Sequence, residues 1–399
     1  MDKAPASSSH KKIKGTLAII AEVGLYHNNG HTFIHWSFGR IIDALAKRYD
    51  RVIVCAPTSF IHSKGFNDYE LKADNIELIP QPSYASSLAA LKCPAPIVRS
   101  YINTLRQADH IFMRGMLPYV GIFYLLARIY NRKPVHWIVG DPVALLRSHR
   151  RSKLIKDMLS LLYAYQDRMF TRIGHKLANG AFICNGNELA SIYSSSRTYP
   201  VVSSTITEDE FFIREDTCQE DTIRILFIGF VRPEKGVEYL VDAIPKLEFN
   251  KNWQLTIIGP WERYEEYKQR LDKRINELGI GDNIKWEGYV SYGPHLWEYL
   301  RSHDIFVLPT LSEGTPRVLV EARANSLPIV ATKVGGIPSS ITDGVDGILV
   351  PSKDSAALAE AINKIVANRN LRRGLIQNGL QSVRKLTIEQ FVKTVISEL

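Results

Sequence analysis

Two glutamates, Glu313 and Glu321, stand in the segment of this sequence that is best suited to chemistry. An apolar strand and a glycine-bearing loop are predicted before a helix that has Thr315 as its cap and Pro316 in its first position. Free N–H groups at such a terminus bind phosphate, and a carboxylate about one turn into the helix can accept two hydrogen bonds from vicinal sugar hydroxyls. The segment predicts a site for a phosphorylated sugar compound, unless both glutamates only complement the helix dipole.

A second candidate is Asp141, which follows the predicted strand 134–139. A carboxylate at the carboxyl end of a parallel strand can polarise a hydroxyl or stabilise developing positive charge. The other interpretation of Asp141 is a turn residue before Pro142. His136 should point into the sheet and is interpreted as a packed core residue.

The elements that must position these residues alternate between strands and helices, which predicts βαβ units and parallel sheets. The polar, acidic stretch 191–221 is interpreted as a linker between two doubly wound α/β domains, with ligands bound in a cleft between them. Strands are predicted at 17–21, 52–56, 111–113, 134–139 and 181–184, and again at 223–228, 255–258, 284–287, 305–308, 329–332 and 347–350. The predicted boundaries are a disordered tail over 1–14, a first domain over 15–215, a second domain over 221–383, and a terminal helix over 384–399 that packs back toward the first domain.

The motifs of the second domain resemble those of retaining glycosyltransferases with the GT-B fold, the glycosyl transferases group 1 family. A Glu-Gly-x-Pro…Glu-Ala frame over 313–322 carries the resemblance, and further segments match in the family's order and spacing. These segments are Gly229 with Lys235-Gly236, Gly259, Trp286–Val290, Val334–Pro338 and Asp343–Gly347. The resemblance covers most of the second domain and implies two Rossmann-like domains facing a central cleft.

The resemblance also implies a donor site for a nucleotide sugar. Glu321 would hold the nucleotide ribose, Glu313 would contact the transferred sugar, and Lys235 would neutralise the diphosphate. The implied donor-binding residues are Gly30, Gly229, Arg232, Lys235, Gly259, Val290, Gly314, Thr315, Pro316, Arg317, Val318 and Glu321, and the implied catalytic residues are Asp141 and Glu313.

Two positions depart from the family pattern. The family's Gly-Arg-Leu reads Gly-Phe-Val from Gly229, so one arginine that grips the diphosphate is missing. Arg232 is the candidate replacement, unless it is simply exposed to solvent. In the first domain Gly140 replaces a histidine that many relatives have, while Asp141 keeps the acidic residue after it. Gly30 aligns with the small-residue loop that approaches the donor phosphate in relatives.

Cleavage of a nucleotide sugar leaves new negative charge on a diphosphate, which helix termini, Lys235 and Arg232 can stabilise without a metal. The chain contains no Asp-x-Asp motif, and neither a metal nor another cofactor is predicted. The resemblance implies retention of the anomeric configuration, by attack on the face that the phosphate leaves. No residue is identified as a covalent nucleophile.

The composition fits a globular protein of two domains, with 399 residues, of which 45% are hydrophobic and 23% charged. Four cysteines without a Cys-x-x-Cys pair argue against a zinc site or a disulfide scaffold and favour a reducing compartment. No apolar signal segment opens the sequence, and the apolar stretch 119–127 is short of the roughly 20 residues that a bilayer span needs. The expected location is the cytoplasm, either free or peripheral on the inner face of a membrane.

Positive charge is concentrated in the first half of the sequence. Residues 1–215 contain 27 Lys and Arg against 17 Asp and Glu, whereas the remainder contains 23 against 24. Within 147–176 a predicted amphipathic helix carries Arg168, Arg172 and Lys176 at four-residue intervals. Its apolar residues are expected to pack on the sheet and its basic stripe to dock on an anionic membrane; the alternatives are an ordinary core-packed helix and, more weakly, a nucleic-acid contact. Further basic residues nearby are Arg150, Arg151 and Lys153.

The sequence therefore predicts a retaining, metal-independent glycosyltransferase that moves a sugar from a nucleotide-sugar donor to a lipid-linked, polysaccharide or other glycan acceptor. Two alternatives stay open: a nucleotide-sugar epimerase on the same fold, and a non-catalytic nucleotide-sugar-binding protein. An epimerase would change the sugar's stereochemistry without a glycosylated product, and a binding protein would hold the donor without turnover.

Overall fold

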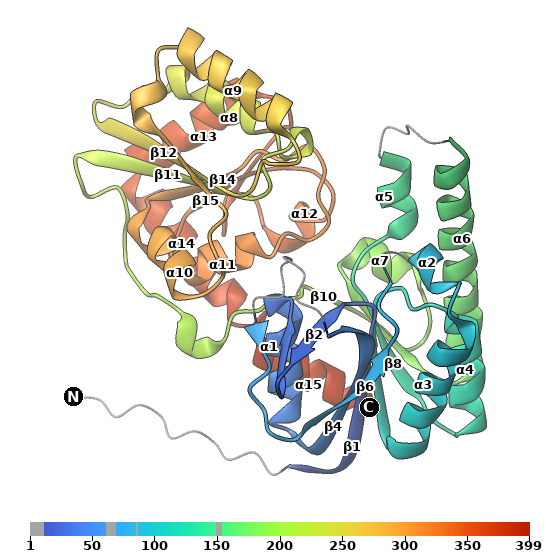
Figure 1. Cartoon of the computed structure of the whole chain (residues 1–399). Helices are drawn as coiled ribbons and strands as arrows, with labels where there is room; N and C mark the ends of the chain where they lie inside the picture. Colours follow the sequence, from blue (N-terminus) through green and yellow to red (C-terminus); the bar gives the residue numbers. More distant parts are fainter. Residues whose placement is uncertain (1–11, 61–68, 85–86, 149–153) are drawn as a thin grey trace, which may run out of the picture. The chain divides into compact units, whose positions relative to one another are not determined.

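The computed structural model describes residues 12–60, 69–84, 87–148 and 154–399, and the chain divides into two compact units. The first unit runs to Val201 and also includes Val392–Leu399, whereas the second unit is Val202–Phe391. Each unit is built on its own sheet (Figure 1). Most of the predicted tail over 1–14 lies outside the described residues, as do the basic residues Arg150, Arg151 and Lys153.

The first unit has a sheet of ten strands among its described residues, in the order β10-β9-β8-β7-β1-β4-β2-β3-β5, and β6 pairs with β4. The strands are β1 (Ile13–Ala21), β2 (Leu25–Asn28), β3 (His31–Ile34), β4 (Tyr49–Ser59), β5 (Tyr69–Glu70), β6 (Ile76–Gln81), β7 (His110–Arg114), β8 (Pro134–Ile138), β9 (Ala181–Asn185) and β10 (Thr198–Val201). The helices are α1 (Trp36–Ala46), α2 (Ser87–Ala90), α3 (Pro94–Gln107), α4 (Val120–Ile129), α5 (Pro142–Ser148), α6 (Leu154–Leu177) and α7 (Asn187–Ile192).

The apolar run that ends β1 lies at the centre of this sheet. Ala18 is fully buried and pairs in parallel register with Ile53 of β4 on one side and with Ile111 of β7 on the other. Strands covered on both faces by helices read as continuous apolar runs, which is why the sequence pattern located them. The strand order reverses between β1 and β7, so the carboxyl ends of these two strands mark the switch point where doubly wound sheets bind ligands.

The second unit has a six-stranded, wholly parallel sheet among its described residues. Its strands are β11 (Thr222–Ile228), β12 (Asn252–Ile258), β13 (Ile284–Gly288), β14 (Ile305–Leu308), β15 (Ile329–Thr332) and β16 (Ile348–Val350). Its helices are α8 (Val237–Ala243), α9 (Glu265–Glu277), α10 (Pro294–Ser302), α11 (Val318–Ala324), α12 (Ile337–Ser340), α13 (Ser355–Ala367) and α14 (Arg369–Val383), with short 3₁₀ turns η1 (Glu208–Glu210), η2 (Pro233–Lys235), η3 (Ile244–Lys246) and η4 (Gly281–Asn283).

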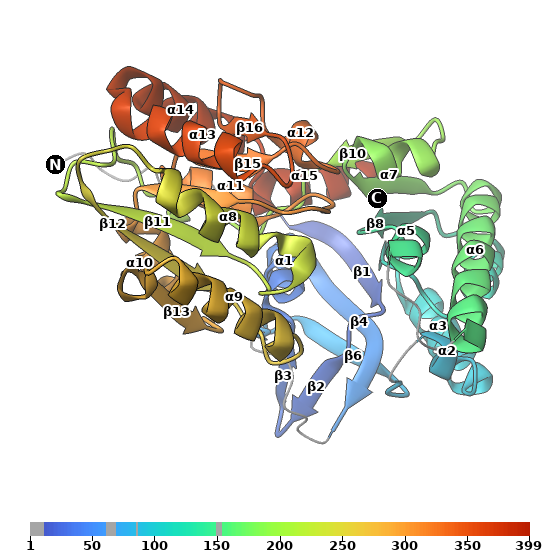
Figure 2. The ribbon, with the colours of Figure 1, turned by 90° about the horizontal axis from the view of Figure 1, so that it is seen from above.

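The strand order of the second sheet is β13-β12-β11-β14-β15-β16, which is the doubly wound order of Rossmann domains. Ile225 of β11 pairs with Leu255 of β12 and with Ile305 of β14, so the order reverses between β11 and β14. Helices cover both faces of this sheet, with α8, α9 and α13 on one side and α10, α11 and α14 on the other (Figures 1 and 2). The predicted fold class, two Rossmann-like α/β domains with parallel sheets, is confirmed.

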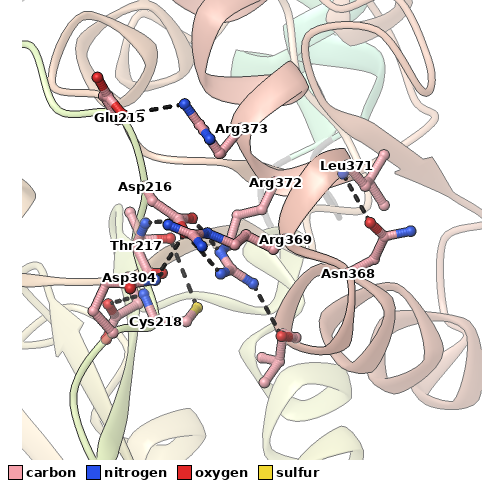
Figure 3. Close-up of polar contacts among 12 residues, drawn as sticks. Glu215, Asp216, Thr217, Cys218, Asp304, Asn368, Arg369, Leu371, Arg372 and Arg373 are labelled. Atoms are coloured by element: carbon pink, nitrogen blue, oxygen red, sulfur yellow. Dashed lines mark hydrogen bonds and ion pairs between the residues drawn. The ribbon is translucent and has the colours of Figure 1, made fainter.

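The acidic segment that was predicted as a linker belongs to the second unit, where ion pairs hold it (Figure 3). The carboxylate of Asp216 accepts hydrogen bonds from Arg372 at 2.7 Å and from Arg369 at 3.0 Å. Glu215 pairs with Arg373 at 3.1 Å. These arginines lie on α14 of the second unit, which begins at Val202 rather than at the predicted residue 221.

The chain returns from the second unit to the first within the last helix, α15 (Ile388–Glu398), between Phe391 and Val392. The backbone N–H of Ile388 donates to the carbonyl of Ile206 at 3.0 Å in the second unit. Arg197 of the first unit pairs with Glu398 at 3.0 Å. The terminal residues thus group with the first unit only from Val392 onward, rather than from residue 384.

Candidate functional site

Several of the predicted site residues of the second unit lie at the switch point of its sheet, between β11 and β14. The loop after β11 contains Gly229 and Lys235, and the loop after β14 contains Glu313 and Gly314. In open α/β sheets ligands bind outside the carboxyl ends of the strands at this point. The strand order therefore brings together two motifs that lie about 80 residues apart in the sequence.

Lys235 and Glu313 form an ion pair across this switch point, from Nζ to Oε1. Lys235 ends the 3₁₀ turn η2 and is 8% exposed, and the side chain of Glu313 is 17% exposed. The two loops are also joined by backbone, since the N–H of Leu311 donates to the carbonyl of Glu234 at 2.8 Å. In such a pair the ammonium of Lys235 can bind a diphosphate, and the carboxylate of Glu313 can accept a hydrogen bond from a sugar hydroxyl.

The Glu313 loop rests on the glycines after β15. A Cβ atom at Gly335 would lie 1.8 Å from the carbonyl oxygen of Glu313, so no side chain fits there. The N–H of Gly336 donates to the carbonyl of Gly314 at 3.0 Å. The segment Val334–Pro338, which was identified by its resemblance to the family, thus positions the backbone of the Glu313 loop by close approach.

Glu321 lies in α11 and is 4% exposed. Its Oε1 accepts a hydrogen bond of 3.5 Å from the hydroxyl of Thr205, and the hydroxyl of Tyr292 donates to the carbonyl of Thr205 at 3.2 Å. Sequence reasoning missed Thr205 and Tyr292, because neither lies in a motif of its own. Together they orient the carboxylate of Glu321, which requires hydrogen-bond partners because burial of an unpaired charge is costly.

The start of α11 corrects one prediction. The helix begins at Val318 with Arg317 as its N-cap, and no side-chain hydrogen bond caps it, so Thr315 is not the cap and Pro316 is not the first helical residue. Both residues instead belong to the loop that follows Gly314. The rigid ring of Pro316 fixes φ in a loop as well as in a first helical turn, which made the two indistinguishable in the sequence.

The carboxyl ends of β11, β12 and β13 are joined by close contacts and hydrogen bonds between backbone atoms. A Cβ atom at Gly259 would lie 1.8 Å from the carbonyl oxygen of Gly229, and the N–H of Gly229 donates to the carbonyl of Ile258 at 2.9 Å. The N–H of Gly259 donates to the carbonyl of Gly288 at 2.7 Å, two residues before the partly buried Val290. The structure therefore places Gly229, Gly259 and Val290 along one edge of the sheet.

Arg232 also lies in the loop after β11, but its nearest charged partner is in the same turn. Its Nε is 3.7 Å from the carboxylate of Glu234, and its guanidinium lies 5.8 Å from the centre of the Phe230 ring. About a third of its side chain is exposed. Its role in place of the family's arginine stays a prediction.

The position of Gly30 does not match its predicted role. Gly30 and Asn29 form the turn between the antiparallel strands β2 and β3, with φ of 84° and 48°. Two consecutive residues with positive φ are typical of the tight turn that joins a hairpin. The loop directly after β1 is instead Glu22–Gly24, so Gly30 is a hairpin residue and not the small residue after the first strand.

Asp141 follows β8 as predicted, and it has both a turn role and a charged partner. Its Oδ1 accepts the N–H of Val143 at 2.9 Å, which starts α5, and it also pairs with the guanidinium of Arg168. His136 is a buried core residue, as expected, with Nδ1 2.8 Å from the hydroxyl of Tyr124. Burial lowers the pKa of His136 to about 4, so it is neutral at physiological pH.

The structure adds a pair that sequence reasoning missed at the switch point of the first unit. Glu22, directly after β1, accepts a hydrogen bond of 2.6 Å from Arg114 at the end of β7. The guanidinium of Arg114 lies 4.9 Å from the Phe38 ring centre and 5.3 Å from that of Trp137. Burial raises the pKa of Glu22 against the opposing charge of Arg114. The only signal in the sequence was an acidic residue immediately after the first strand.

The predicted basic helix is two helices, α5 and α6, and α6 does not present the predicted stripe. Arg172 and Lys176 are exposed, but Arg168 turns inward to Asp141 and is 19% exposed. The apolar side chains of α6 that were expected to pack on the sheet are exposed, including Leu162 and Ile173. The prediction of a core-facing apolar side on this helix is therefore wrong.

Within the described ranges, no three His, Cys, Asp or Glu residues are grouped as metal ligands. The four cysteines are free. No helix in the part of the chain that the structure describes is both long enough and apolar enough to cross a bilayer.

Comparison with known sequences identifies the second unit. Residues 208–382 match the model of the family described as glycosyl transferases group 1. The chain is 33% identical over 170 residues to an uncharacterised glycosyltransferase of Methanocaldococcus jannaschii, which covers 43% of this chain and 46% of the relative. It is 32% identical over 158 residues to the D-inositol 3-phosphate glycosyltransferase of Geodermatophilus obscurus, or 38% of this chain and 35% of the relative. The chain thus matches less than half the length of these curated relatives.

Comparison with solved structures extends to both units. The crystal structure of HepE from Anabaena in complex with UDP has a TM-score of 0.68 and 17% identity, and the match covers 96% of this chain and 100% of that chain. A likeness at this identity concerns the fold. Residues 208–382 are therefore similar to the glycosyl transferases group 1 family, and the two Rossmann-like units have the GT-B fold.

Proposed function

We propose that this protein is a glycosyltransferase that moves a sugar from a nucleotide-sugar donor to a lipid-linked, polysaccharide or other glycan acceptor. The observation that carries the proposal is the Lys235–Glu313 pair at the switch point of a glycosyl transferases group 1 domain. The buried Glu321 supports it, because a carboxylate on α11 suits the two hydroxyls of a ribose. The HepE structure supports a uridine nucleotide as the first donor to test, since it holds UDP.

In the proposed reaction the oxygen of the acceptor hydroxyl bonds to the anomeric carbon while the bond from that carbon to the diphosphate oxygen breaks. Negative charge grows on the leaving diphosphate, which takes up the proton of the acceptor hydroxyl. The Lys235 ammonium stabilises that charge, and Arg232 is the second cation in the same loop. Glu313 accepts a hydroxyl of the transferred sugar, and Asp141 of the first unit polarises the acceptor hydroxyl. Retention of the anomeric configuration and independence from a metal complete the proposal. The proposed location is the cytoplasm, either free or peripheral on the inner face of a membrane.

The test begins with the donor. Thermal unfolding is measured with UDP, GDP and ADP and with their sugar conjugates, because a ligand that binds only the folded state raises the Tm. The selected donor is then incubated with glycan and lipid-linked acceptors, with and without a metal chelator. Transfer that persists with the chelator and retains the anomeric configuration supports the proposal. Donor binding without product on any acceptor favours a binding protein, and a changed donor sugar without transfer favours an epimerase.

A further inference from the structure

The long helix α6 of the first unit exposes an apolar side. Leu162 is 63% exposed and Ile173 is 57% exposed, and their neighbours at three- and four-residue spacings are also exposed. The side of α6 that packs inward carries small or polar residues, among them Ala164, Thr171 and Gly174. The amphipathic pattern of this helix is therefore directed away from the core of its own unit.

Helix α4 extends the same apolar surface. It packs against α6 (Figure 1), and a Cβ atom at Gly174 of α6 would lie 2.4 Å from the ring of Tyr124 on α4. Ile129 of α4 is 66% exposed. The exposed apolar residues of the two helices, called here the α4–α6 face, are Ile122, Leu125, Ile129, Met158, Leu159, Leu162, Met169, Phe170, Ile173 and Leu177. Monomeric proteins rarely expose so many adjoining apolar side chains unless the surface binds something.

A cavity of about 430 Å³ opens within the α4–α6 face. Leu91, Ile122, Leu125 and Phe170 supply its apolar lining, and Asp167 is among its polar lining residues. Oδ1 of Asp167, a residue only 8% exposed, has no hydrogen-bond partner within the described parts of the chain. A largely apolar cavity of this volume lies in the range that holds a small molecule or one chain of a larger one.

The charges around the α4–α6 face have one sign. Arg128 of α4 and Arg172 and Lys176 of α6 are exposed. The acidic residues of the two helices are Asp157, which is partly buried, and Asp167, which is buried. A surface that combines exposed apolar side chains with cations and few exposed carboxylates complements an anionic lipid surface.

We infer that the α4–α6 face docks on an anionic bilayer, with its apolar side chains among the acyl chains and one hydrocarbon chain of a lipid in the cavity. A second copy of this chain fits less well, because a two-fold contact places the same cation-bearing surface on both sides. The inference rests on the proposed function, since it names the surface on which that enzyme would meet a lipid-linked acceptor. Its experiments need neither donor nor acceptor, so each proposal can fail alone.

The first experiment is sedimentation of the full chain with vesicles of phosphatidylcholine that contain about 30% phosphatidylglycerol. The wild type should sediment with them and not with pure phosphatidylcholine. The variant Leu162→Gln/Ile173→Gln should lose at least about tenfold in partitioning, because two apolar side chains no longer enter the acyl region. The matched control is Ile213→Gln, which removes an equally exposed isoleucine from the second unit and should bind like wild type.

A second pair of variants tests the contribution of the basic residues to vesicle binding. Arg172→Gln/Lys176→Gln should weaken binding to the anionic vesicles several-fold, whereas Lys364→Gln/Lys385→Gln, two exposed lysines of the second unit, should not. Thermal unfolding shows that each variant is folded. Wild-type partitioning of the Leu162→Gln/Ile173→Gln variant overturns the inference, and so does equal binding to neutral and anionic vesicles. Loss of a dimer in that variant, without any vesicle binding by the wild type, would instead identify a contact between copies.

The cavity is tested with palmitoyl lysophosphatidylglycerol below its micelle concentration. A bound hydrocarbon chain should raise the Tm of the wild type. Ile122→Trp fills part of the cavity and should remove most of that rise, whereas Ile129→Trp, on the same helix but outside the cavity lining, should retain it. Equal Tm shifts in both variants would exclude the cavity as the binding site for the chain.

Discussion

The ammonium of Lys235, after β11, pairs with the carboxylate of Glu313, after β14, although 78 positions separate them in the chain. Both side chains are mostly buried, so each neutralises the other in the absence of ligand. If the protein binds a nucleotide sugar as proposed, binding exchanges part of this pair for contacts to the diphosphate and the sugar.

Substitutions of Lys235 and Glu313 should have coupled effects on the free energy of unfolding but different effects on function. Lys235→Met should destabilise the fold by roughly 2–4 kcal/mol, because it leaves a buried carboxylate without its partner. Lys235→Met/Glu313→Gln should recover part of that loss, with a coupling free energy of about 1–3 kcal/mol in a double-mutant cycle measured by denaturant unfolding. Glu313→Gln alone should lower turnover while sparing nucleotide affinity. Additive effects of the two single changes would contradict the pairing.

Glu321 should control affinity for the nucleotide rather than turnover. Glu321→Ala removes a buried charged acceptor and should weaken nucleotide binding by about 2–3 kcal/mol in titration calorimetry. Thr205→Val removes the hydroxyl that orients Glu321 and should cost less. Glu360→Ala, which removes an exposed glutamate from α13, is the control and should leave affinity unchanged. Unchanged affinity in Glu321→Ala would refute the assignment.

Asp141 should affect transfer and not donor binding. Asp141→Asn keeps an oxygen that can accept the N–H of Val143 but removes the charge that pairs with Arg168. The expected result is slower transfer at saturating donor, with donor affinity and Tm close to those of wild type. If turnover stays at the wild-type level, Asp141 acts only in the turn that starts α5.

The buried carboxyl of Asp167 should make stability depend on pH. Burial, with a smaller contribution from the charge of Glu22, raises the pKa of Asp167 to about 7. Between about pH 4 and pH 7 the unfolded chain ionises this group while the folded protein keeps it protonated, so stability falls as pH rises, and above that window the cost is constant. Asp167→Asn removes this cost.

The measurement for Asp167 is the difference in unfolding free energy between Asp167→Asn and wild type. It should grow by roughly 2–4 kcal/mol from pH 4 to pH 8 in favour of the variant, because each pKa unit corresponds to about 1.4 kcal/mol. Asp157→Asn is the matched control for removing one negative charge from α6. A difference that is flat across the pH range would show that the carboxyl is ionised in the folded protein at low pH.

The sequence by itself determined the strands and the family motifs. Fully apolar runs such as 17–21 and 225–228 are typical of buried strands of a parallel sheet, because both faces of such a strand are covered. The frame around Glu313 and Glu321 located the candidate site for the same kind of reason, since its glycines and carboxylates have few structural uses together. In both cases the residue types within one short segment were sufficient for the prediction.

Tertiary structure decided which distant residues meet. Glu22 and Arg114 pair because the strand order reverses between β1 and β7, and Thr205 reaches Glu321 across 116 positions. Neither relationship leaves a periodic signal, because it depends on which strand ends adjoin in the sheet. Gly30 shows the reverse case, because it is close to β1 in the sequence but lies in the turn between β2 and β3.

The orientation of α6 was also decided only by packing. The spacing of its apolar residues establishes that the helix has an apolar side, but periodicity does not say whether that side faces the core. Gly174 and the small residues around it allow α6 to pack closely on α4, and this contact turns Leu162 and Ile173 outward. The sequence fixes the pattern of a helix, whereas the shape of its neighbour decides which side is buried.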